Sequence, residues 1–482
     1  MFRRVSDGCP RQAYFFQGLN YYVGRRIPLS HEVVAETGFS ENAPPRADRL
    51  GVASWCLYDW ANSAFSSVVT TFIFATYFTE AVAESSTSGT AQWGRTLGLC
   101  GLVIAILSPI FGAVGDRGGR RKPWLAVFTL LCVAGTSLLW FIGPSPSNVR
   151  WALVLFAIAT LGFEFATVFY NAMLPDIVSE NYLGRVSGWG WGLGYAGGLF
   201  CLVIALLVLV QAEQPPFGLD RQASEHIRAT NLLVGAWYAL FSLPVFLWTA
   251  DRPSQGLTLR AAVREGLRTL AGTLRHVRRY GSVVRFLVAH MIYADGLVTL
   301  FAFGGIYAAG TFGMDFTEVI WFGIALNVTA GAGAALFAWV DDKAGSKRTI
   351  LIALTCLIAL GAVGVLAESK QTFWLFGMAL GVFVGPAQAA SRSLMARLAP
   401  RELQTEMFGL FALSGKATTF LGPLVLGTVT ETFQSQRAGM ASVLCFFLVG
   451  LLLLLLVEEP RRATSSGRSA PRARLSETER QP

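Results

Sequence analysis

The segment Gly112–Lys122 reads Gly-Ala-Val-Gly-Asp-Arg-Gly-Gly-Arg-Arg-Lys and lies between two long apolar runs. A weaker copy, Ala-Trp-Val-Asp-Asp-Lys-Ala-Gly-Ser-Lys-Arg at residues 338–348, follows 226 residues later. Glycines let the chain turn tightly between two helices, and the charges stay outside the hydrocarbon of a bilayer. A charged turn that recurs at half-chain distance predicts a membrane bundle made of two related halves.

Composition supports a membrane protein. The 482 residues are 53% hydrophobic and only 14% charged, with a mean hydropathy of +0.49, whereas soluble chains carry about 25% charged residues. A transmembrane helix needs about 20 mostly apolar residues, and β-barrel strands are about half as long and alternate in polarity. The sequence therefore predicts an all-α membrane protein with twelve transmembrane helices, at 53–79, 94–114, 123–143, 150–174, 186–211, 231–250, 284–309, 317–339, 348–367, 372–394, 405–430 and 438–457.

The net charge of +9 follows the expected topology. With both termini in the cytoplasm, 32 of the 39 lysines and arginines fall on the cytoplasmic side. This is the positive-inside bias of multi-pass membrane proteins. We interpret the basic character as a topology signal and expect no nucleic-acid partner.

Five segments are expected along the chain: a disordered cytoplasmic arm (1–50), a six-helix bundle (51–250), a cytoplasmic linker (251–283), a second six-helix bundle (284–458) and a disordered tail (459–482). The linker predicts a basic amphipathic helix on the inner leaflet, with a calmodulin-like target site as the alternative. Its apolar residues recur at helical spacing among arginines: Leu259, Val263, Leu267, Leu270, Leu274 and Val277, with Arg260, Arg264, Arg268, Arg275, Arg278 and Arg279.

Signals for catalysis or cofactor binding are weak. Six of the seven cysteines lie singly in predicted spans, no CxxC or CxxH spacing occurs, and the four histidines are scattered. The stretch Ser414–Thr418, Ser-Gly-Lys-Ala-Thr, lacks the upstream glycine of a P-loop. We therefore expect no enzyme activity, no cofactor and no metal site.

Further matches between the halves support the repeat. Tyr58–Ser63 corresponds to Tyr293–Gly296, and Asn171–Asp176 corresponds to Ser391–Ala396. With the charged turn, the offsets are 236, 226 and 220 in chain order. Parallel six-helix repeats with slightly shorter connections in the second half would give this series, which predicts two pseudo-symmetric bundles.

The charged turn resembles the signature of the major facilitator superfamily. In that family an acid at the place of Asp116 interacts with the positive N-terminal end of a helix in the other half, here the eleventh, and latches one conformation. The latch residues that the resemblance implies, with their second-half counterparts, are Gly112, Asp116, Arg117, Gly119, Arg120, Arg121, Asp342, Lys343 and Gly345. The alternatives are a solvated turn for Asp116 and an orienting role alone for the bases.

A narrower resemblance begins at residues 55–65, Trp-Cys-Leu-Tyr-Asp-Trp-Ala-Asn-Ser-Ala-Phe. This string is similar to the autophagy-related vacuolar effluxer family and its bacterial relatives, the unknown major facilitator family. Residues 170–176, 185–198, 293–296, 408–416 and 421–423 also fit. The resemblance implies a monomeric transporter of a small solute that works by alternating access in the bacterial inner membrane, with membrane lipid around it. Export of amino acids is the specific expectation, since fungal members are thought to perform it.

Polar groups within the spans supply the candidate solute or proton site, because a charge in the membrane usually faces a cavity or a partner. The charged or titratable candidates are Asp59, Glu164, His290, Asp295 and Lys416, with the neutral candidates Asn62, Asn171 and Gln388. In the family, spans 1, 4, 7 and 10 line the cavity, and they carry most of these residues.

Several roles stay open at this stage. Asp59 and Asp295 occupy corresponding positions in the two repeats. Each would bind a solute ammonium group, exchange a proton or form a structural ion pair. Glu164 is the candidate proton carrier or a partner of Lys416. Lys416 would otherwise bind a solute carboxylate. Proton coupling competes with facilitated diffusion. A non-transporting sensor or scaffold and a lipid translocator are the alternative functions.

Overall fold

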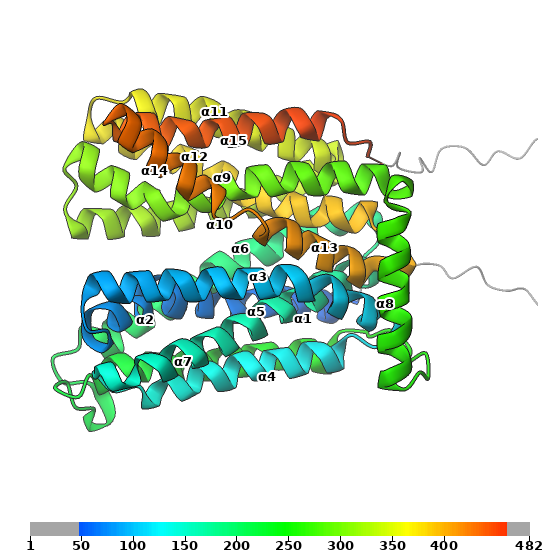
Figure 1. Cartoon of the computed structure of the whole chain (residues 1–482), viewed down its shortest axis with the longest axis horizontal. Coiled ribbons are helices and arrows are strands. Elements are labelled where there is room, and N and C mark those ends of the chain that lie inside the picture. Colours follow the sequence, from blue (N-terminus) through cyan, green and yellow to red (C-terminus); the bar gives the residue numbers. More distant parts are fainter. Residues whose placement is uncertain (1–47, 460–482) are drawn as a thin grey trace, which may run out of the picture. The chain divides into compact units, whose positions relative to one another are not determined.

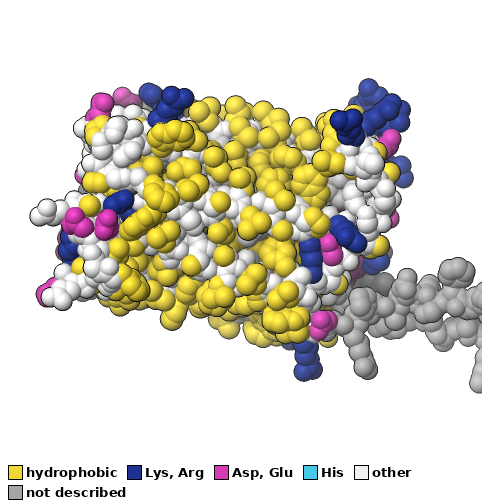
Figure 2. All heavy atoms as spheres, turned by 90° about the horizontal axis from the view of Figure 1, so that it is seen from below, with side chains coloured by type: hydrophobic (Ala, Val, Ile, Leu, Met, Phe, Trp, Pro, Cys, Tyr) yellow, Lys and Arg dark blue, Asp and Glu magenta, His cyan; other side chains and the backbone are white. Residues whose placement is uncertain are grey.

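The computed structural model describes residues 48–459, all within one compact unit. The expected N-terminal arm (1–50) and C-terminal tail (459–482) lie outside the described residues except at their inner edges. Residues 48–459 contain twelve apolar helical spans long enough to cross a membrane and no β-strand. The all-α, twelve-span prediction is therefore confirmed. Figure 2 shows a broad band of apolar side chains between two ends at which charged side chains gather.

The first six spans form the N-terminal bundle. They are α1, η1, α2 and η2 together (Arg49–Ala64, Phe65–Phe72, Phe74–Tyr77 and Phe78–Val82), α3 (Ser86–Gly118), α4 with η3 (Lys122–Leu138, Leu139–Phe141), α5 after η4 (Pro146–Asn148, Val149–Ile177), α6 with η5 and η6 (Glu180–Tyr182, Leu183–Ile204, Ala205–Val210) and α7 (Glu225–Trp248). A short turn, η7 (Pro216–Gly218), precedes α7.

The last six spans form the C-terminal bundle. They are α9 after η8 (Val277–Tyr280, Gly281–Phe312), α10 (Phe316–Ala344), α11 (Ser346–Leu366), α12 (Lys370–Leu398), α13 and α14 after η9 (Arg401–Leu403, Gln404–Lys416, Leu421–Phe433) and α15 (Gln436–Leu455). The linker helix α8 (Leu259–Arg275) runs across the ends of the spans in Figure 1.

The eleventh span differs from the continuous helix expected at 405–430. It is broken between Lys416, the last residue of α13, and Leu421, the first residue of α14. The backbone N–H of Gly422 donates to Asp295 Oδ2 at 3.1 Å, so a side chain of α9 satisfies one of the donors exposed at the start of α14.

Two turn glycines explain why the charged turn is repeated. Gly119 has φ +81° and Gly345 has φ +98°, a region that L side chains rarely adopt. Gly119 follows α3, the second span of the N-terminal bundle, and Gly345 follows α10, the second span of the C-terminal bundle. A Cβ on Gly119 would also overlap the carbonyl oxygen of Pro253 in the linker. Both turns therefore require glycine for backbone reasons.

The bundles meet mainly at one end, which we call the basic end; it carries residues 119–121, 249–280 and 399–403. Across the bundles α3 packs against α13, and α6 packs against α10. In the eleventh span, α13 contacts α3 and α5 of the other bundle, whereas α14 packs against α9 and α15 of its own bundle. The bundles are thus joined at the basic end, and α14 extends toward the opposite, far end.

Candidate functional site

Asp116, at the basic end of α3, caps the eleventh span. Its Oδ1 accepts the backbone N–H of Thr405 at 3.1 Å, and its Oδ2 accepts that of Glu406 at 2.9 Å. Both donors lie in the first turn of α13, where the helix dipole favours a negative charge. This is the contact that the resemblance implied, and it joins the two bundles.

Arg121 extends this contact into a network. Its guanidinium is buried; it donates to Thr405 Oγ1 at 2.9 Å and to Gln404 Oε1 at 3.2 Å, and it pairs with Asp176. Arg252 of the linker binds the same Asp176 at 2.8 Å and the same Gln404 oxygen at 2.7 Å. Burial lowers the pKa of the Arg121 guanidinium from its ordinary value, and the carboxylate of Asp176 opposes this shift.

The remaining latch candidates lie around this network. Arg117 donates to Thr269 Oγ1 of α8 at 2.7 Å, and Arg120 is exposed. In the second-half copy, Asp342 pairs with Arg185 of the other bundle at 3.3 Å, and Lys343 occupies the last turn of α10. Each copy of the charged turn therefore places a carboxylate in a contact between the two bundles.

Close backbone approach makes Gly112 sensitive to substitution. A Cβ at this position would overlap the carbonyl oxygen of Thr405. We expect Gly112→Ala to weaken the packing of α3 against α13 by roughly 1.4 kcal/mol, the cost of disturbing one close contact. Gly118→Ala in the same helix is the matched control, because nothing lies within 4 Å of that Cβ. Equal unfolding temperatures for the two purified variants would refute this expectation.

Asp59 is not a free carboxylate. Arg392 of α12 donates through Nη1 to Asp59 Oδ2 at 2.9 Å, and the pair links the first and tenth spans. The same guanidinium donates to Ser187 Oγ at 2.9 Å, to the Ser187 carbonyl at 2.7 Å and to Asn171 Oδ1 at 3.3 Å. Asp59 and Asn171, two predicted site residues, are therefore brought together by an arginine that the sequence analysis did not select.

Aromatic rings complete the surroundings of Arg392. Its guanidinium lies 4.7 Å from the ring centroid of Trp55 and 5.7 Å from those of Tyr170 and Trp191. Cations are attracted to such ring faces. The available signal was the position of Arg392 inside the predicted span 372–394, where a charge needs a partner.

Glu164 and Lys416 form a second cross-bundle pair. Lys416 Nζ lies 2.6 Å from Glu164 Oε1, which joins α5 to the end of α13. The side chains are 34% (Lys416) and 17% (Glu164) exposed, so this pair is more accessible than the Asp59–Arg392 pair, where the side-chain values are 14% and 4%. The pairing considered from the sequence is thus present, and it remains accessible.

The other candidates are placed separately. Asn62 is buried and accepts from Ser63 Oγ at 3.4 Å, and Tyr195 donates to Gln388 Oε1 at 2.6 Å, another contact between the bundles. His290 contacts Ser414 Oγ at 2.8 Å rather than Asp295. Asp59 and Asp295 have different partners and do not form a joint site.

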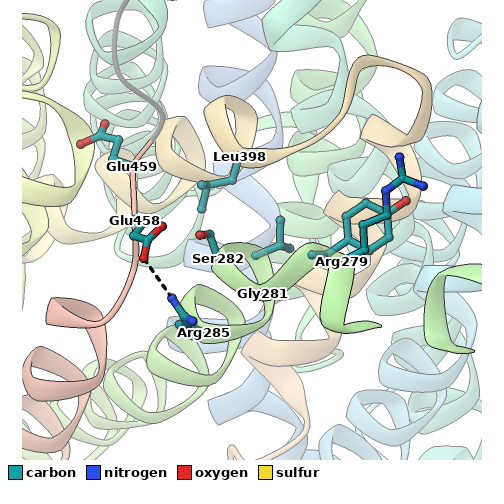
Figure 3. Close-up of a pocket in the computed structure, with 9 residues that line it drawn as sticks. Arg279, Gly281, Ser282, Arg285, Leu398, Glu458 and Glu459 are labelled. Carbon is teal, nitrogen blue, oxygen red and sulfur yellow. Dashed lines mark ion pairs between the residues drawn. The ribbon is translucent and has the colours of Figure 1, made fainter. Parts of the chain in front are cut away.

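A surface pocket of about 500 Å³ lies away from these residues (Figure 3). Arg279, Arg285 and Glu458 line it at the basic end of the C-terminal bundle, and Arg285 pairs with Glu458 at 3.6 Å. It contains none of the predicted site residues. The candidate functional site is therefore the layered set of polar contacts between the bundles.

Comparison with known proteins gives the relatives of the chain. The family model described as "Vacuole effluxer Atg22 like" matches residues 95–184 and 180–466. The uncharacterized MFS-type transporter YxiO of Bacillus subtilis is 29% identical over 413 residues, covering 84% of this chain and 94% of its own length. Autophagy-related protein 22 of Yarrowia lipolytica is 24% identical over 449 residues, covering 75% of this chain and 74% of its own length.

Solved structures share the fold at low identity. The proton:xylose symporter XylE has a TM-score of 0.63 and 13% identity, covering 85% of this chain and 96% of that one. The transporter FucP in its outward conformation has a TM-score of 0.61 and 14% identity, covering 85% and 98%. The family match spans most of the chain, and the chain therefore belongs to the vacuole effluxer Atg22-like family, a branch of the major facilitator superfamily of membrane transporters.

Proposed function

We propose that this transporter carries an amino acid, bound as a zwitterion between Glu164 and Lys416, and exports it from the cytoplasm. The observation that carries the proposal is the 2.6 Å ion pair between these residues across the two bundles. An amino acid presents one ammonium and one carboxylate group. Its ammonium would replace Lys416 at the Glu164 carboxylate, and its carboxylate would replace Glu164 at the Lys416 ammonium.

The accessibility of the pair supports this exchange. Desolvating a charge is expensive, so a solute that supplies both opposite charges leaves neither Glu164 nor Lys416 unpaired. The Asp59–Arg392 pair is more buried, and it is held by Ser187 and Asn171 as well. We propose that the accessible pair, Glu164–Lys416, exchanges partners with the solute. The buried pair, Asp59–Arg392, holds the two bundles closed at the basic end. Asn62 and Gln388 are proposed as neutral polar groups beside the pathway.

The arrangement of the bundles supports alternating access. Contacts at the basic end join the bundles. Among the principal helix contacts of residues 48–459, α14 packs only against helices of its own bundle. The positive-inside bias assigns the basic end to the cytoplasm. With that orientation, the contacts at the basic end support a state closed to the cytoplasm. Both halves of the site lie on one chain, so a monomer suffices for transport.

Charge neutralisation tests the proposal. Counterflow of a mixture of radiolabelled amino acids into proteoliposomes should fall by about 10- to 100-fold in Glu164→Gln and in Lys416→Met, because each variant loses one charge-assisted contact of about 1.5–3 kcal/mol. Glu431→Gln, which removes an exposed carboxylate of α14, is the matched control.

The charge-swapped double variant, Glu164→Lys with Lys416→Glu, separates binding from structure. It keeps an ion pair between α5 and α13, so we expect wild-type thermal stability without wild-type transport. Full transport by the double variant would show that the pair is only structural and would contradict the proposal. Wild-type protein that moves none of the amino acids would contradict the assigned solute class.

A further inference from the structure

Asp295 lies within α9, and its side chain is only half satisfied. The residue is 1% exposed. Its Oδ2 accepts the N–H of Gly422 at 3.1 Å, whereas Oδ1 has no hydrogen-bond partner among the described residues. One turn later, the fully buried Thr299 also has an Oγ1 without a partner in residues 48–459. Buried polar atoms are normally paired, because an unmet partner costs about 1–3 kcal/mol.

The two unpartnered oxygens face the same point of the broken eleventh span. A Cβ built on Gly422 would lie 2.8 Å from Asp295 Oδ1 and would overlap Thr299 Oγ1. Gly422 belongs to the first turn of α14, directly after the break at residues 417–420. A carboxyl group and a hydroxyl group therefore share a buried site beside a helix N-terminus.

No cation is paired with Asp295 in the described part of the chain. The helices that pack against α9 are α10, α12, α13, α14 and α15. Their titratable or charged groups, with those of α9 itself, are Glu318, Asp341, Asp342, Lys343, Lys370, Arg392, Arg397, Glu406, Lys416, Glu431, Arg437, Cys445, Arg285, His290, Tyr293 and Tyr307. The cations closest along the chain to Asp295 or Gly422 have other partners: Lys416 pairs with Glu164, Arg285 pairs with Glu458, and Arg437 donates to the carbonyl of Val365. Arg392 of α12 pairs with Asp59.

We propose that Asp295, with Thr299, binds the coupling proton of this transporter at the break of the eleventh span. A proton taken from water converts Oδ1 into a hydroxyl donor, and Thr299 Oγ1 is the adjacent acceptor. On release the proton returns to water, and no other bond changes. A metal cation fits poorly, since hard cations take about six oxygen ligands and only two unpartnered side-chain oxygens face this point.

The break offers a route from proton binding to the solute pair. Deprotonated Asp295 places a negative charge at the N-terminus of α14, where the helix dipole favours it. Protonation removes that charge and weakens the hold on Gly422. Lys416 is the last residue of α13, immediately before the break, so a change in the break moves the partner of Glu164. This link rests on the proposed function, whereas proton binding itself can be measured without a solute.

Infrared difference spectroscopy of the full chain in lipid bilayers tests the site. Spectra recorded between low and high pH should contain the C=O band of a buried protonated carboxyl group. We expect Asp295→Asn to lose this band and Glu431→Gln, which removes an exposed carboxyl group, to retain it. Thr299→Val should keep the band but shift its frequency, because the acceptor is gone. A band that persists unchanged in Asp295→Asn, or a Thr299→Val spectrum identical to wild type, would overturn the proposal.

Further measurements distinguish a failure of the proton-site proposal from a failure of the solute-site proposal. Thermal stabilisation by sodium chloride over choline chloride at fixed pH, lost in Asp295→Asn, would identify a metal-ion site and overturn the proton assignment. In proteoliposomes, Asp295→Asn should retain counterflow but lose accumulation driven by a pH gradient. Loss of counterflow in Glu164→Gln tests the solute site separately, so the two proposals fail independently.

Discussion

Replacing Arg392 by methionine is expected to abolish transport and to lower the free energy of unfolding by about 3–5 kcal/mol. The substitution leaves the Asp59 carboxylate without its cation in a site where only 14% of its side chain is exposed. It also removes the donors to Ser187 and Asn171, so contacts from three spans of the N-terminal bundle are lost together. Thermal unfolding of the purified protein and counterflow in proteoliposomes measure the two effects.

A double variant separates the unpaired charge from the lost contact. Asp59→Asn with Arg392→Met removes the isolated carboxylate, so most of the stability should return while transport stays absent. Asp59→Asn alone should be expressed but inactive. Arg285→Met is the matched control, because that arginine is 50% exposed and pairs with Glu458 at the surface. If Arg392→Met unfolded at the same temperature as the wild type, the Asp59–Arg392 pair would not hold the bundles together.

Neutralising Asp116 is expected to shift the transporter about tenfold toward a state open at the basic end. The carboxylate accepts two backbone N–H groups at the start of α13, and losing its charge weakens that cap by about 1–2 kcal/mol. A difference of 1.4 kcal/mol changes a two-state population tenfold. A single cysteine at position 404 reports the change, since Gln404 is buried against Arg121 in the closed state.

The thiol at position 404 should react about tenfold faster with a polar maleimide in Asp116→Asn than in the parent. Asp48→Asn is the control, because Asp48 also caps a helix, α1, but makes its cap contact with Leu50 of the same helix. Equal labelling of the Asp116→Asn variant and the parent would mean that the cap does not govern the basic end.

The sequence was sufficient for the fold because apolar run lengths and the repeated charged turn are local signals. The contact of Asp116 with the eleventh span followed from a family resemblance, and the structure places it there. Arg392 was missed although it lies inside the predicted span 372–394. Its partner Asp59 lies 333 residues away in the chain, and no periodicity specifies which distant side chain neutralises a buried charge.

The break in the eleventh span has a local signal that the span prediction did not use. Pro423 has no N–H to donate to the carbonyl of residue 419, and it directly follows Gly422, so local propensity favours a break just before α14. The break is accompanied by the contact of Asp295 with Gly422, which belongs to tertiary packing. Arg252, at the start of the linker, was likewise not selected from the sequence, although it binds Asp176 and Gln404.

Alternating access is tested most directly by two distances measured in one set of spin-labelled proteins by pulsed electron resonance. One pair, Asn181 and Arg348, spans the bundles at the basic end, and the other, Thr87 and Thr432, spans them at the far end; all four positions are exposed. In Asp116→Asn, the basic-end distance should be longer and the far-end distance should be shorter than in the parent. If the basic-end distance changes while the far-end distance stays constant, the two bundles do not rock about a central site.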